Sequence, residues 1–359
     1  MLIQSGIDFN IPFAVLDPDA NAPCSRLADF THGKLTDYDT VMKFGQGCDI
    51  ITIEIENVNV AALKDLARQG KKVYPQPEVI ELIQDKRVQK TFYKENAIPT
   101  AEFILTENAD DVRKHAAFLP AVNKLGREGY DGRGVKILRT KDDLTGAFDA
   151  PGLLEKLIDF EKEIAVIVGR NEAGEIKAFP VVEMVFHPVQ NLVEYLFSPA
   201  EVTSEVATRA EDIARTIISK LDMVGLLAVE MFVTKTGDVL VNEIAPRPHN
   251  SGHQTIEGNI TSQYEQHLRA ILNLPLGDTD TVQPAAMVNL LGEPGYEGPA
   301  CYQGFREVVS RAGIHVHLYG KEITKPFRKM GHVTIVGDDV ATLRQNTEFV
   351  KQTLKVISL

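Results

Sequence analysis

The chain has 359 residues, a hydrophobic content of 44%, a charged content of 25% and a formal net charge of -12. This length predicts two or three domains, and the composition is typical of a soluble globular protein, which excludes a single small module and a disordered chain. The acidic balance excludes nucleic acid as a general partner, so an anionic substrate must meet a local cluster of cations or backbone N–H groups.

The cysteines and the apolar runs indicate the compartment. Cys24, Cys48 and Cys301 lie far apart and lack the spacing of a disulfide framework or a zinc site, which favours a reducing environment. No apolar run reaches the roughly 18 residues of a membrane span, and no signal-peptide pattern opens the chain. We therefore expect a cytoplasmic protein with no membrane partner.

Residues 1–84 alternate between helical and strand patterns. A short helix and a turn precede a strand at Phe13–Leu16, and the β-branched run Cys48–Val58 predicts a buried parallel strand. The segment Val60–Pro75 then predicts a helix, a glycine stop and another short strand. These patterns favour an α/β domain, although the strand and glycine-rich turn that usually open a doubly wound domain are missing.

A second unit is predicted over residues 85–160 and a third over 161–359. One long amphipathic helix follows Pro77 and ends near Ala97, as a connection between domains would. The second unit has the pattern of a small α+β lid. The third contains strands, a helix of clear 3.6-residue period at Ala207–Val224, a hairpin, and a closing strand and helix.

A glycine loop in the second unit has the order G-x-x-G-x-G, at Gly129, Gly132 and Gly134. This order fits neither the dinucleotide fingerprint nor the P-loop. Because both flanking runs have strand character, we expect a β-hairpin. Protein kinases lay such a hairpin over nucleotide phosphates, and Lys124 on the incoming strand would add a positive charge there. The alternative is a mobile surface hairpin.

The hairpin in the third unit carries two acidic residues. A four-residue turn at Lys235–Asp238 would place Glu230 directly opposite Glu243, and like charges facing each other destabilise a sheet. A divalent cation would remove that cost, because Mg²⁺ is held by one or two carboxylates together with substrate phosphates. Asn242 supplies another oxygen nearby. The alternative is an exposed strand pair with two solvated acids.

Two further segments gather polar side chains. The loop Ala245–His253 follows the hairpin and crowds an arginine, two histidines, an asparagine and a serine between stiffening prolines, which favours substrate contact. A late basic cluster contains Lys321, Lys325, Arg328 and Lys329. It would bind a substrate phosphate, or it is a solvated charged face.

Together, the reversed glycine hairpin, the paired glutamates and the order of the three units resemble the ATP-grasp superfamily. Within it, "GYDGRG", "NEIAPRPHNSGH" and "RKMGH" resemble the 5-(carboxyamino)imidazole ribonucleotide synthetases of purine biosynthesis, over essentially the whole chain. The middle motif is the most specific of the three. The resemblance implies α/β and α+β architecture: an ATP-grasp fold with a truncated Rossmann-like N-terminal domain, a small lid domain and a larger C-terminal domain.

The activity that this resemblance implies is an ATP-dependent carbon–nitrogen ligation. ATP would phosphorylate bicarbonate to carboxyphosphate, and the exocyclic amine of aminoimidazole ribonucleotide would take up the carboxyl group, from that intermediate or from the CO₂ it releases. The products would be 5-(carboxyamino)imidazole ribonucleotide, ADP and phosphate, on the de novo route to IMP. The protein's task would be positioning and charge neutralisation.

The resemblance also implies the site residues. The ATP phosphates would contact Lys86, Lys124, Gly129, Tyr130, Asp131, Gly132, Arg133, Gly134 and Val135. The adenine edge would contact Glu155, Lys156, Leu157 and Ile158, and the ribose would contact Glu163. Mg²⁺, or Mn²⁺ in its place, would lie between Glu230 and Glu243, with Asn242 and Glu243 also beside ATP. Bicarbonate and the imidazole would face Tyr130, Asp131, Arg247, His249, Asn250 and Ser251, among which Asp131, Arg247 and His249 would be catalytic. The ribonucleotide phosphate would contact Lys321 and Arg328.

Two departures from the family pattern stand out. The family opens with a strand and a Gly-Gly-Gly-Gln-Leu-Gly-Arg turn, whereas this chain starts at what would be the Met after that turn. We expect either a start site further upstream or a first domain that lacks a central strand. The family's Val-Glu-Asn-x-His corresponds to Val182–Phe186 followed by His187, one residue late, which leaves an ATP contact at that position open.

Alternative functions stay open. Another ATP-grasp ligase would act on a different amine, which the His-Asn-Ser-Gly-His sequence disfavours. A catalytically inactive homologue would be a binding protein, which the retained Lys124, Glu230 and Glu243 disfavour. The glycine order disfavours a Rossmann oxidoreductase. From the family we also expect a homodimer and a functional link to the mutase of the next pathway step.

Overall fold

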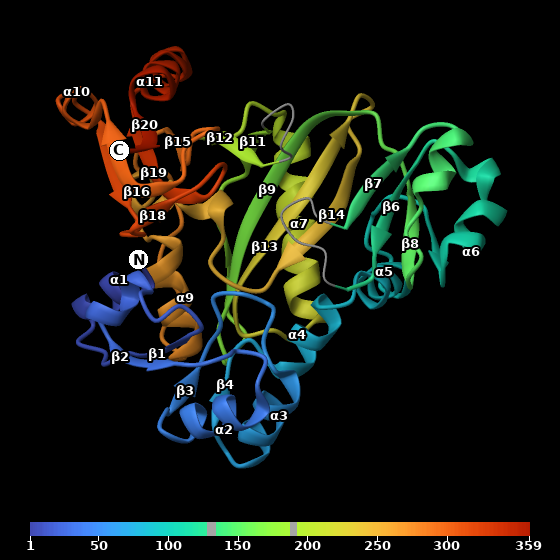
Figure 1. Cartoon of the computed structure of the whole chain (residues 1–359), viewed down its shortest axis with the longest axis horizontal. Coiled ribbons are helices and arrows are strands. Elements are labelled where there is room, and N and C mark those ends of the chain that lie inside the picture. Colours follow the sequence, from blue (N-terminus) through green and yellow to red (C-terminus); the bar gives the residue numbers. More distant parts are fainter. Residues whose placement is uncertain (128–133, 187–191) are drawn as a thin grey trace.

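The structure is a computed structural model that describes residues 1–127, 134–186 and 192–359. Its N-terminal part, blue in Figure 1, alternates short helices with very short parallel strand pairs. The elements in chain order are α1 (Leu2–Asp8), β1 (Ala14–Asp17), a 3-10 helix (Pro23–Arg26), β2 (Asp29–His32), α2 (Tyr38–Gln46), β3 (Ile50–Ile51), α3 (Val60–Arg68) and β4 (Lys72–Val73). Strand β1 pairs with β2, and β3 pairs with β4.

The strand predicted over Cys48–Val58 is parallel, as expected, but only Ile50–Ile51 pairs with a neighbour. The physical reason is the Glu-Ile-Glu sequence that follows Ile53. Ile53 is still buried, whereas Glu54 is exposed and Glu56 is partly exposed. A parallel strand buried on both faces disfavours carboxylates, so the chain leaves the sheet here, and Glu56 pairs with Arg247 instead.

The long helix predicted after Pro77 is two helices, α4 (Pro77–Ile83) and α5 (Lys86–Glu95). The break lies at Asp85, whose carboxylate accepts a hydrogen bond from the Arg87 backbone N–H at 3.0 Å and so caps α5. The same carboxylate pairs with the guanidinium groups of Arg87 and Arg127. The break therefore fixes where α5 begins, directly at Lys86.

The lid is a four-stranded antiparallel sheet in the order β5-β8-β6-β7. Its elements are β5 (Phe103–Thr106), α6 (Ala109–Lys114), a 3-10 helix (Ala116–Phe118), β6 (Ala121–Leu125), β7 (Val135–Leu138), a second 3-10 helix (Asp142–Gly146) and β8 (Gly152–Lys156). The antiparallel pair of β6 and β7 confirms the two strands predicted around the glycine loop. Residues 128–133, between them, lie outside the described residues.

The largest sheet has nine strands among the described residues, and each of its pairings is antiparallel. Its order is β14-β13-β9-β11-β12-β15-β19-β17, with β10 beside β9. The strands are β9 (Phe160–Arg170), β10 (Ile176–Ala178), β11 (Val182–Phe186), β12 (Val193–Ser198), β13 (Gly225–Thr234), β14 (Val239–Ala245), β15 (Ala285–Leu291), β17 (Ile314–Leu318) and β19 (Lys329–Val336).

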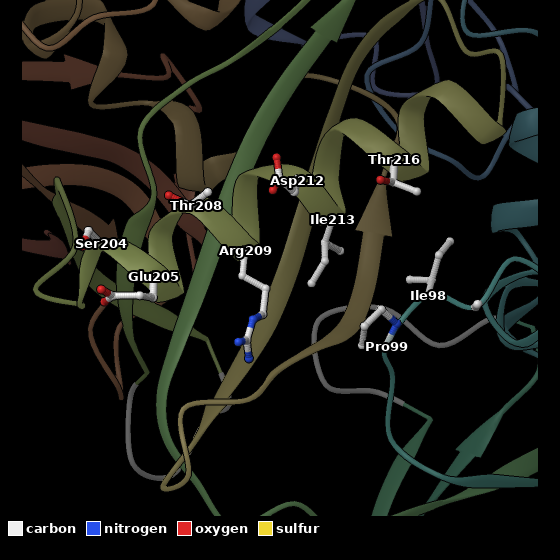
Figure 2. Close-up of a pocket in the computed structure, with 10 residues that line it drawn as sticks. Ile98, Pro99, Ser204, Glu205, Thr208, Arg209, Asp212, Ile213 and Thr216 are labelled. Carbon is white, nitrogen blue, oxygen red and sulfur yellow. The ribbon is translucent and has the colours of Figure 1, made fainter.

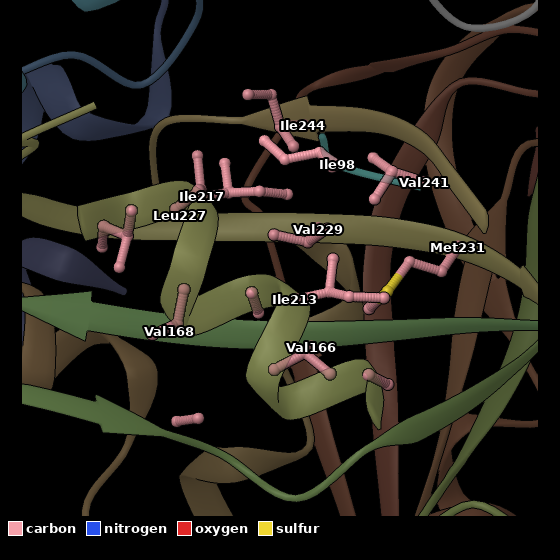
Figure 3. Packing of buried hydrophobic residues seen from close by; sticks show 14 of the residues in the cluster. Ile98, Val166, Val168, Ile213, Ile217, Leu227, Val229, Met231, Val241 and Ile244 are labelled. Carbon is pink, nitrogen blue, oxygen red and sulfur yellow. The ribbon is translucent and has the colours of Figure 1, made fainter. Parts of the chain in front are cut away.

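Helix α7 (Ser204–Lys220) covers the part of this sheet that carries the glutamates. Its periodic apolar residues, among them Ile213 and Ile217, pack on Val166 of β9 and Val229 of β13 (Figure 3). The predicted helix at Ala207–Val224 is confirmed, displaced by one turn toward the N-terminus because Thr203 is the capping residue. This core makes β9, β13 and β14 a rigid support for the polar residues on them.

The rest of the chain surrounds the far end of the sheet. A 3-10 helix (Asn250–Gly252), α8 (Thr255–Gly258) and α9 (Gln263–Ile271) follow β14, and α9 packs against α1. A small sheet in the order β18-β16-β20 lies at the C-terminal end (Figure 1). Its elements and neighbours are β16 (Gly298–Gln303), α10 (Phe305–Val309), β18 (Ile323–Thr324), α11 (Val340–Thr353) and β20 (Lys355–Ser358). The sequence predicts a helix as the last element, whereas the structure has the further strand β20 after it. Among the described residues, no helix is long and apolar enough to cross a membrane.

Candidate active site

The paired glutamates lie where the sequence predicts them. Glu230 on β13 is directly opposite Glu243 on β14, and a register shift follows at this point. Nearer the turn, Met231 faces Val241, so the bulge falls at Asn242. Glu163 on β9 is two residues from Ala165, the residue that pairs with Glu230. Three carboxylates therefore lie on one face of three adjacent strands.

The two facing carboxylates are in opposite electrostatic states. Burial, followed by the charges of Glu243 and Glu163, raises the pKa of Glu230 to about 8. Glu243 instead pairs with Lys86 Nζ at 2.8 Å, and the lysine charge holds the pKa of Glu243 at about 2. Burial also raises the pKa of Glu163 to about 7, with Glu243 as the second cause. Lys86 therefore offsets the negative charge of Glu243, whereas the pKa values of Glu230 and Glu163 stay raised.

A second lysine–glutamate cluster adjoins the first. Glu155 on β8 is 4% exposed, and its carboxylate forms ion pairs with Lys124 on β6 and with Lys90 on α5. Burial alone would raise the pKa of Glu155, but the two lysines hold it below its ordinary value. Lys124 Nζ also donates a hydrogen bond to Asn242 Oδ1 at 3.1 Å, which joins the lid to the glutamate hairpin.

The remaining residues expected at the nucleotide lie at and just after the end of β8 and on the glycine hairpin. The Lys156 backbone N–H donates to Glu102 O at 2.8 Å, and the Leu157 N–H donates to Pro120 O at 3.2 Å, so both donors are engaged within the lid. The Lys156 ammonium donates to Phe118 O. On the hairpin, Val135 pairs with Lys124, and Gly134 has the left-handed φ of 74° that favours glycine. The residues predicted at Gly129, Tyr130, Asp131, Gly132 and Arg133, and His187, lie outside the described residues.

The loop after β14 converges on Glu230. His249 Nε2 is 3.5 Å from Glu230 Oε1, and His249 Nδ1 is 2.9 Å from the hydroxyl oxygen of Ser251. Burial, followed by the charge of Arg247, lowers the pKa of His249 to about 3, so its imidazole is neutral at neutral pH. Arg247 Nε donates to Glu56 Oε1 at 2.9 Å and so ties this loop to the N-terminal part of the chain.

The other polar residues of the loop have inward-facing partners. Asn250 and Asn289 of β15 exchange hydrogen bonds of 2.8 and 3.0 Å, and Asn289 also donates to Val193 O at 2.7 Å. His253, which the sequence places among the loop's donors, is buried with its Nδ1 2.9 Å from the Tyr264 hydroxyl. His253 therefore belongs to the support of the loop.

The late basic cluster is divided by the fold. Lys321 Nζ donates to Lys329 O at 2.8 Å, and Arg328 Nη1 donates to Ile323 O at 2.7 Å. The charge of Lys329 lowers the pKa of Glu230 and the pKa of His249, so Lys329 lies near the glutamate hairpin. The sequence includes Lys329 in the cluster but not among the substrate residues. Its place at the start of β19, opposite Leu291 of β15, becomes evident only from the sheet.

The carboxylates fit a divalent cation that also takes ligands from a substrate. Within residues 1–127, 134–186 and 192–359, no three His, Cys, Asp or Glu side chains are grouped as a complete metal cage. Two facing carboxylates with an amide oxygen beside them are a donor set of the kind that holds Mg²⁺ together with phosphate oxygens. A cation bound between the two carboxylates would favour their charged forms and so lower the pKa of Glu230.

A separate groove of about 540 Å³ lies between α7 and the segment 97–99 (Figure 2). Its lining includes both Arg209 and Asp212 on α7, together with Ile98 and Pro99. None of the described candidate site residues lines this groove. The candidate active site therefore lies where β9, β13, β14 and the lid converge, and not at this groove.

Three family descriptions match successive parts of the chain. They are the ribonucleotide synthetase preATP-grasp domain at residues 1–84, the ATP-grasp domain at 91–264, and the phosphoribosylaminoimidazole carboxylase C-terminal domain at 285–346. The N5-carboxyaminoimidazole ribonucleotide synthase of Synechococcus elongatus is 37% identical over 93% of this chain and 86% of its own length. The chain belongs to the N5-carboxyaminoimidazole ribonucleotide synthetase family.

Other members of this synthetase family confirm the fold. The crystal structure of the Thermotoga maritima synthetase has a TM-score of 0.92 and 40% identity, and the match covers 100% of this chain and 96% of that one. The Aspergillus clavatus synthase, solved in complex with ADP and 5-aminoimidazole ribonucleotide, has a TM-score of 0.89 and 30% identity, covering 98% and 94%. The ATP-grasp architecture expected from the sequence is therefore confirmed.

Some relatives in the family are longer. The chloroplastic phosphoribosylaminoimidazole carboxylase of Vigna aconitifolia is 38% identical over 96% of this chain, but the match covers 63% of the plant protein. The chain thus spans about two thirds of that relative and nearly the whole length of the T. maritima synthetase.

Proposed function

We propose that the chain catalyses ATP-dependent carboxylation of 5-aminoimidazole ribonucleotide by bicarbonate, in purine biosynthesis. One observation carries this proposal. Two lysines suited to binding phosphates, Lys86 and Lys124, lie beside the facing Glu230 and Glu243. The loop that contains His249 reaches the same place. It is supported by a relative of the same fold whose structure contains ADP and the aminoimidazole ribonucleotide.

In the first step, a bicarbonate oxygen attacks the γ-phosphorus of ATP, and the bond from that phosphorus to the bridging oxygen of ADP breaks. Lys124 and Lys86 bring positive charge to the lid and hairpin sides of the site, where they offset charge on the phosphates. Glu230 and Glu243 would hold Mg²⁺, or Mn²⁺ in its place, which would neutralise phosphate oxygens when bound. The products of this step are ADP and carboxyphosphate.

In the second step, the exocyclic amine of the ribonucleotide bonds to the carboxyl carbon, phosphate leaves, and the amine loses one proton. The carbon arrives in carboxyphosphate or in CO₂ released from it. Arg247 brings a positive charge that its pair with Glu56 orients. His249 is neutral, because its pKa is lowered to about 3, so it suits a hydrogen bond to bicarbonate or to the imidazole and not a fixed positive charge.

The finer assignments belong to the same proposal. Glu163 is the partner proposed for the nucleotide ribose, and Glu155, Lys156, Leu157 and Ile158 form the segment proposed for the adenine edge. Lys321 and Arg328 are proposed for the ribonucleotide phosphate. The homodimer, the cytoplasmic location and the functional link to the next mutase remain predictions from the resemblance.

The test is ADP release with ATP, Mg²⁺ and bicarbonate, with and without 5-aminoimidazole ribonucleotide. We expect release to depend on the ribonucleotide and on bicarbonate. Release that a different amine stimulates instead would replace the substrate in this proposal. The absence of both nucleotide binding and turnover would favour a binding protein.

A further inference from the structure

A buried lysine that none of the family motifs includes adjoins the proposed phosphate residues. Lys90 lies on α5, one helical turn after Lys86, and is 2% exposed. Its ammonium forms an ion pair with the Glu155 carboxylate and donates a hydrogen bond to the Thr100 hydroxyl. Thr100 in turn donates to the Val241 carbonyl of β14 at 2.7 Å. Lys90 therefore connects the lid strand β8 to the hairpin that carries the glutamates.

Positively charged side chains outnumber the carboxylate at Glu155. Glu155 contacts Lys124 as well as Lys90, so two ammonium groups share one carboxylate. The nearby Lys86 forms its ion pair with Glu243. If Lys90 were absent, Glu155 and Lys124 would form a neutral pair, and an anionic ligand would have to compete with a buried carboxylate for Lys124. With Lys90 in place, Lys90, Lys124 and Glu155 together carry one net positive charge, which also acts on the neighbouring Glu163 and Glu243.

Burying an ammonium group is costly, and an apolar side chain would suit the helix position better on stability alone. The ammonium group of Lys90 is also shielded from solvent, because α5, β8 and the segment at Thr100 enclose it. We therefore expect Lys90 to serve function and not stability. In this geometry it leaves the positive charge of Lys124 in excess over Glu155.

We propose that Lys90 is a positioning residue for nucleotide binding, which neutralises Glu155 and thereby leaves the charge of Lys124 for the nucleotide phosphates. This inference rests on the proposed function, since it places those phosphates at Lys124. Lys90 itself does not touch the nucleotide. Its effect should therefore grow with the number of phosphates and should be absent for a nucleoside.

The test is calorimetric binding of ADP, AMP and adenosine to the full chain and to three variants. Lys90→Met removes the charge, Lys90→Arg keeps it, and Lys94→Met removes an exposed lysine from the same helix as a control. We expect Lys90→Met to weaken ADP binding about tenfold, with a smaller loss for AMP and none for adenosine. Lys94→Met and Lys90→Arg should bind ADP like the original chain at neutral pH.

A pH series separates this role from a structural one. Burial, partly opposed by Glu155 and assisted by Lys124 and Lys86, lowers the pKa of Lys90 to about 8. The original chain should lose ADP affinity as the pH rises through about 8, whereas Lys90→Arg should lose less, because a guanidinium stays charged. Glu230 titrates in the same range, but it is common to both proteins, so their difference reports Lys90. This comparison holds even if Lys90→Met does not fold.

The outcomes are distinct. Equal ADP binding by Lys90→Met and the original chain would overturn the inference. Equal losses for ADP and adenosine would also overturn it, because they would indicate damage to the adenine side of the site. Identical pH profiles for Lys90→Arg and the original chain would do the same. Failure of the original chain to bind ADP would instead refute the proposed function on which the inference rests.

Discussion

The facing glutamates predict that one substitution should stabilise the metal-free protein while removing its activity. Glu230→Gln removes one of two carboxylates that lie directly opposite each other. Burial opposes the charged form of Glu230, and so do Glu243 and Glu163. If Glu230 and Glu243 were both charged about 5 Å apart, their repulsion alone would be roughly 3 kcal/mol at an effective dielectric constant of about 20. The raised pKa leads to a similar value, since a carboxyl with a pKa of about 8 in the folded state and 4.5 when unfolded opposes folding at neutral pH by about 3 kcal/mol.

The sign follows from the direction of the shift. Because the folded-state pKa is raised, the contribution of Glu230 to stability is present below its ordinary pKa and is lost as the pH rises toward about 8. Glu230→Gln should therefore exceed the original chain in stability at neutral pH, and the difference should vanish below about pH 4.5.

The assay is urea unfolding of both proteins in a metal chelator across this pH range, together with ADP release in Mg²⁺. We expect the variant to require more urea at neutral pH and to show no turnover. A variant less stable than the original chain at neutral pH would refute the electrostatic reasoning. Retained turnover would refute the assignment of Glu230 to the cation.

Three further predictions follow from single contacts. Glu243→Ala should abolish ADP release with an unchanged circular dichroism spectrum. Activity within twofold of the original, a change of only about 0.4 kcal/mol in the barrier, would contradict the assignment of Glu243 to the metal site. Burial lowers the pKa of His267 to about 4, so folding should weaken by about 2 kcal/mol between neutral pH and about pH 5, as the unfolded histidine takes up its proton. His267→Gln can keep the bond to Thr52 and should flatten the pH dependence of urea unfolding, and an unchanged slope would contradict this. Asn289→Leu removes the partner of Asn250 and should raise the KM for the ribonucleotide more than the KM for ATP, and equal changes would argue for a general structural defect.

The sequence alone predicts much of the glutamate hairpin, although the local geometry differs from the expected turn. A four-residue turn placed Glu230 opposite Glu243, and that pairing is confirmed. The turn is tighter, because the Thr234 N–H donates to Asp238 O across it and Gly237 takes a left-handed φ of 81°. A bulge at Asn242 restores the expected pairing. Hairpin turn rules are local, whereas a bulge depends on neighbouring strands and on the lysine contact of Asn242.

Short elements and isolated charges were harder to predict. The helix break at Asp85 has a local signal, since an aspartate that caps the next helix interrupts an otherwise continuous amphipathic pattern. The final strand, β20, has few residues and depends on β16, more than fifty positions earlier in the chain. Lys90 belongs to none of the motifs, because its partner Glu155 lies on another element. Lys329 belongs to the basic cluster in the sequence, but its effect on Glu230 depends on how β19 sits in the sheet. Motifs identify residues that contact substrates better than residues that position them.

The central claim is that this chain transfers the carboxyl group of bicarbonate to the ribonucleotide through a phosphorylated intermediate. Mass spectrometry of the products made from bicarbonate labelled with heavy carbon and heavy oxygen tests it most directly. We predict that the heavy carbon appears in the carboxylated ribonucleotide and that one heavy oxygen appears in the released phosphate. Phosphate without heavy oxygen, or an unlabelled ribonucleotide beside ADP, would contradict the account.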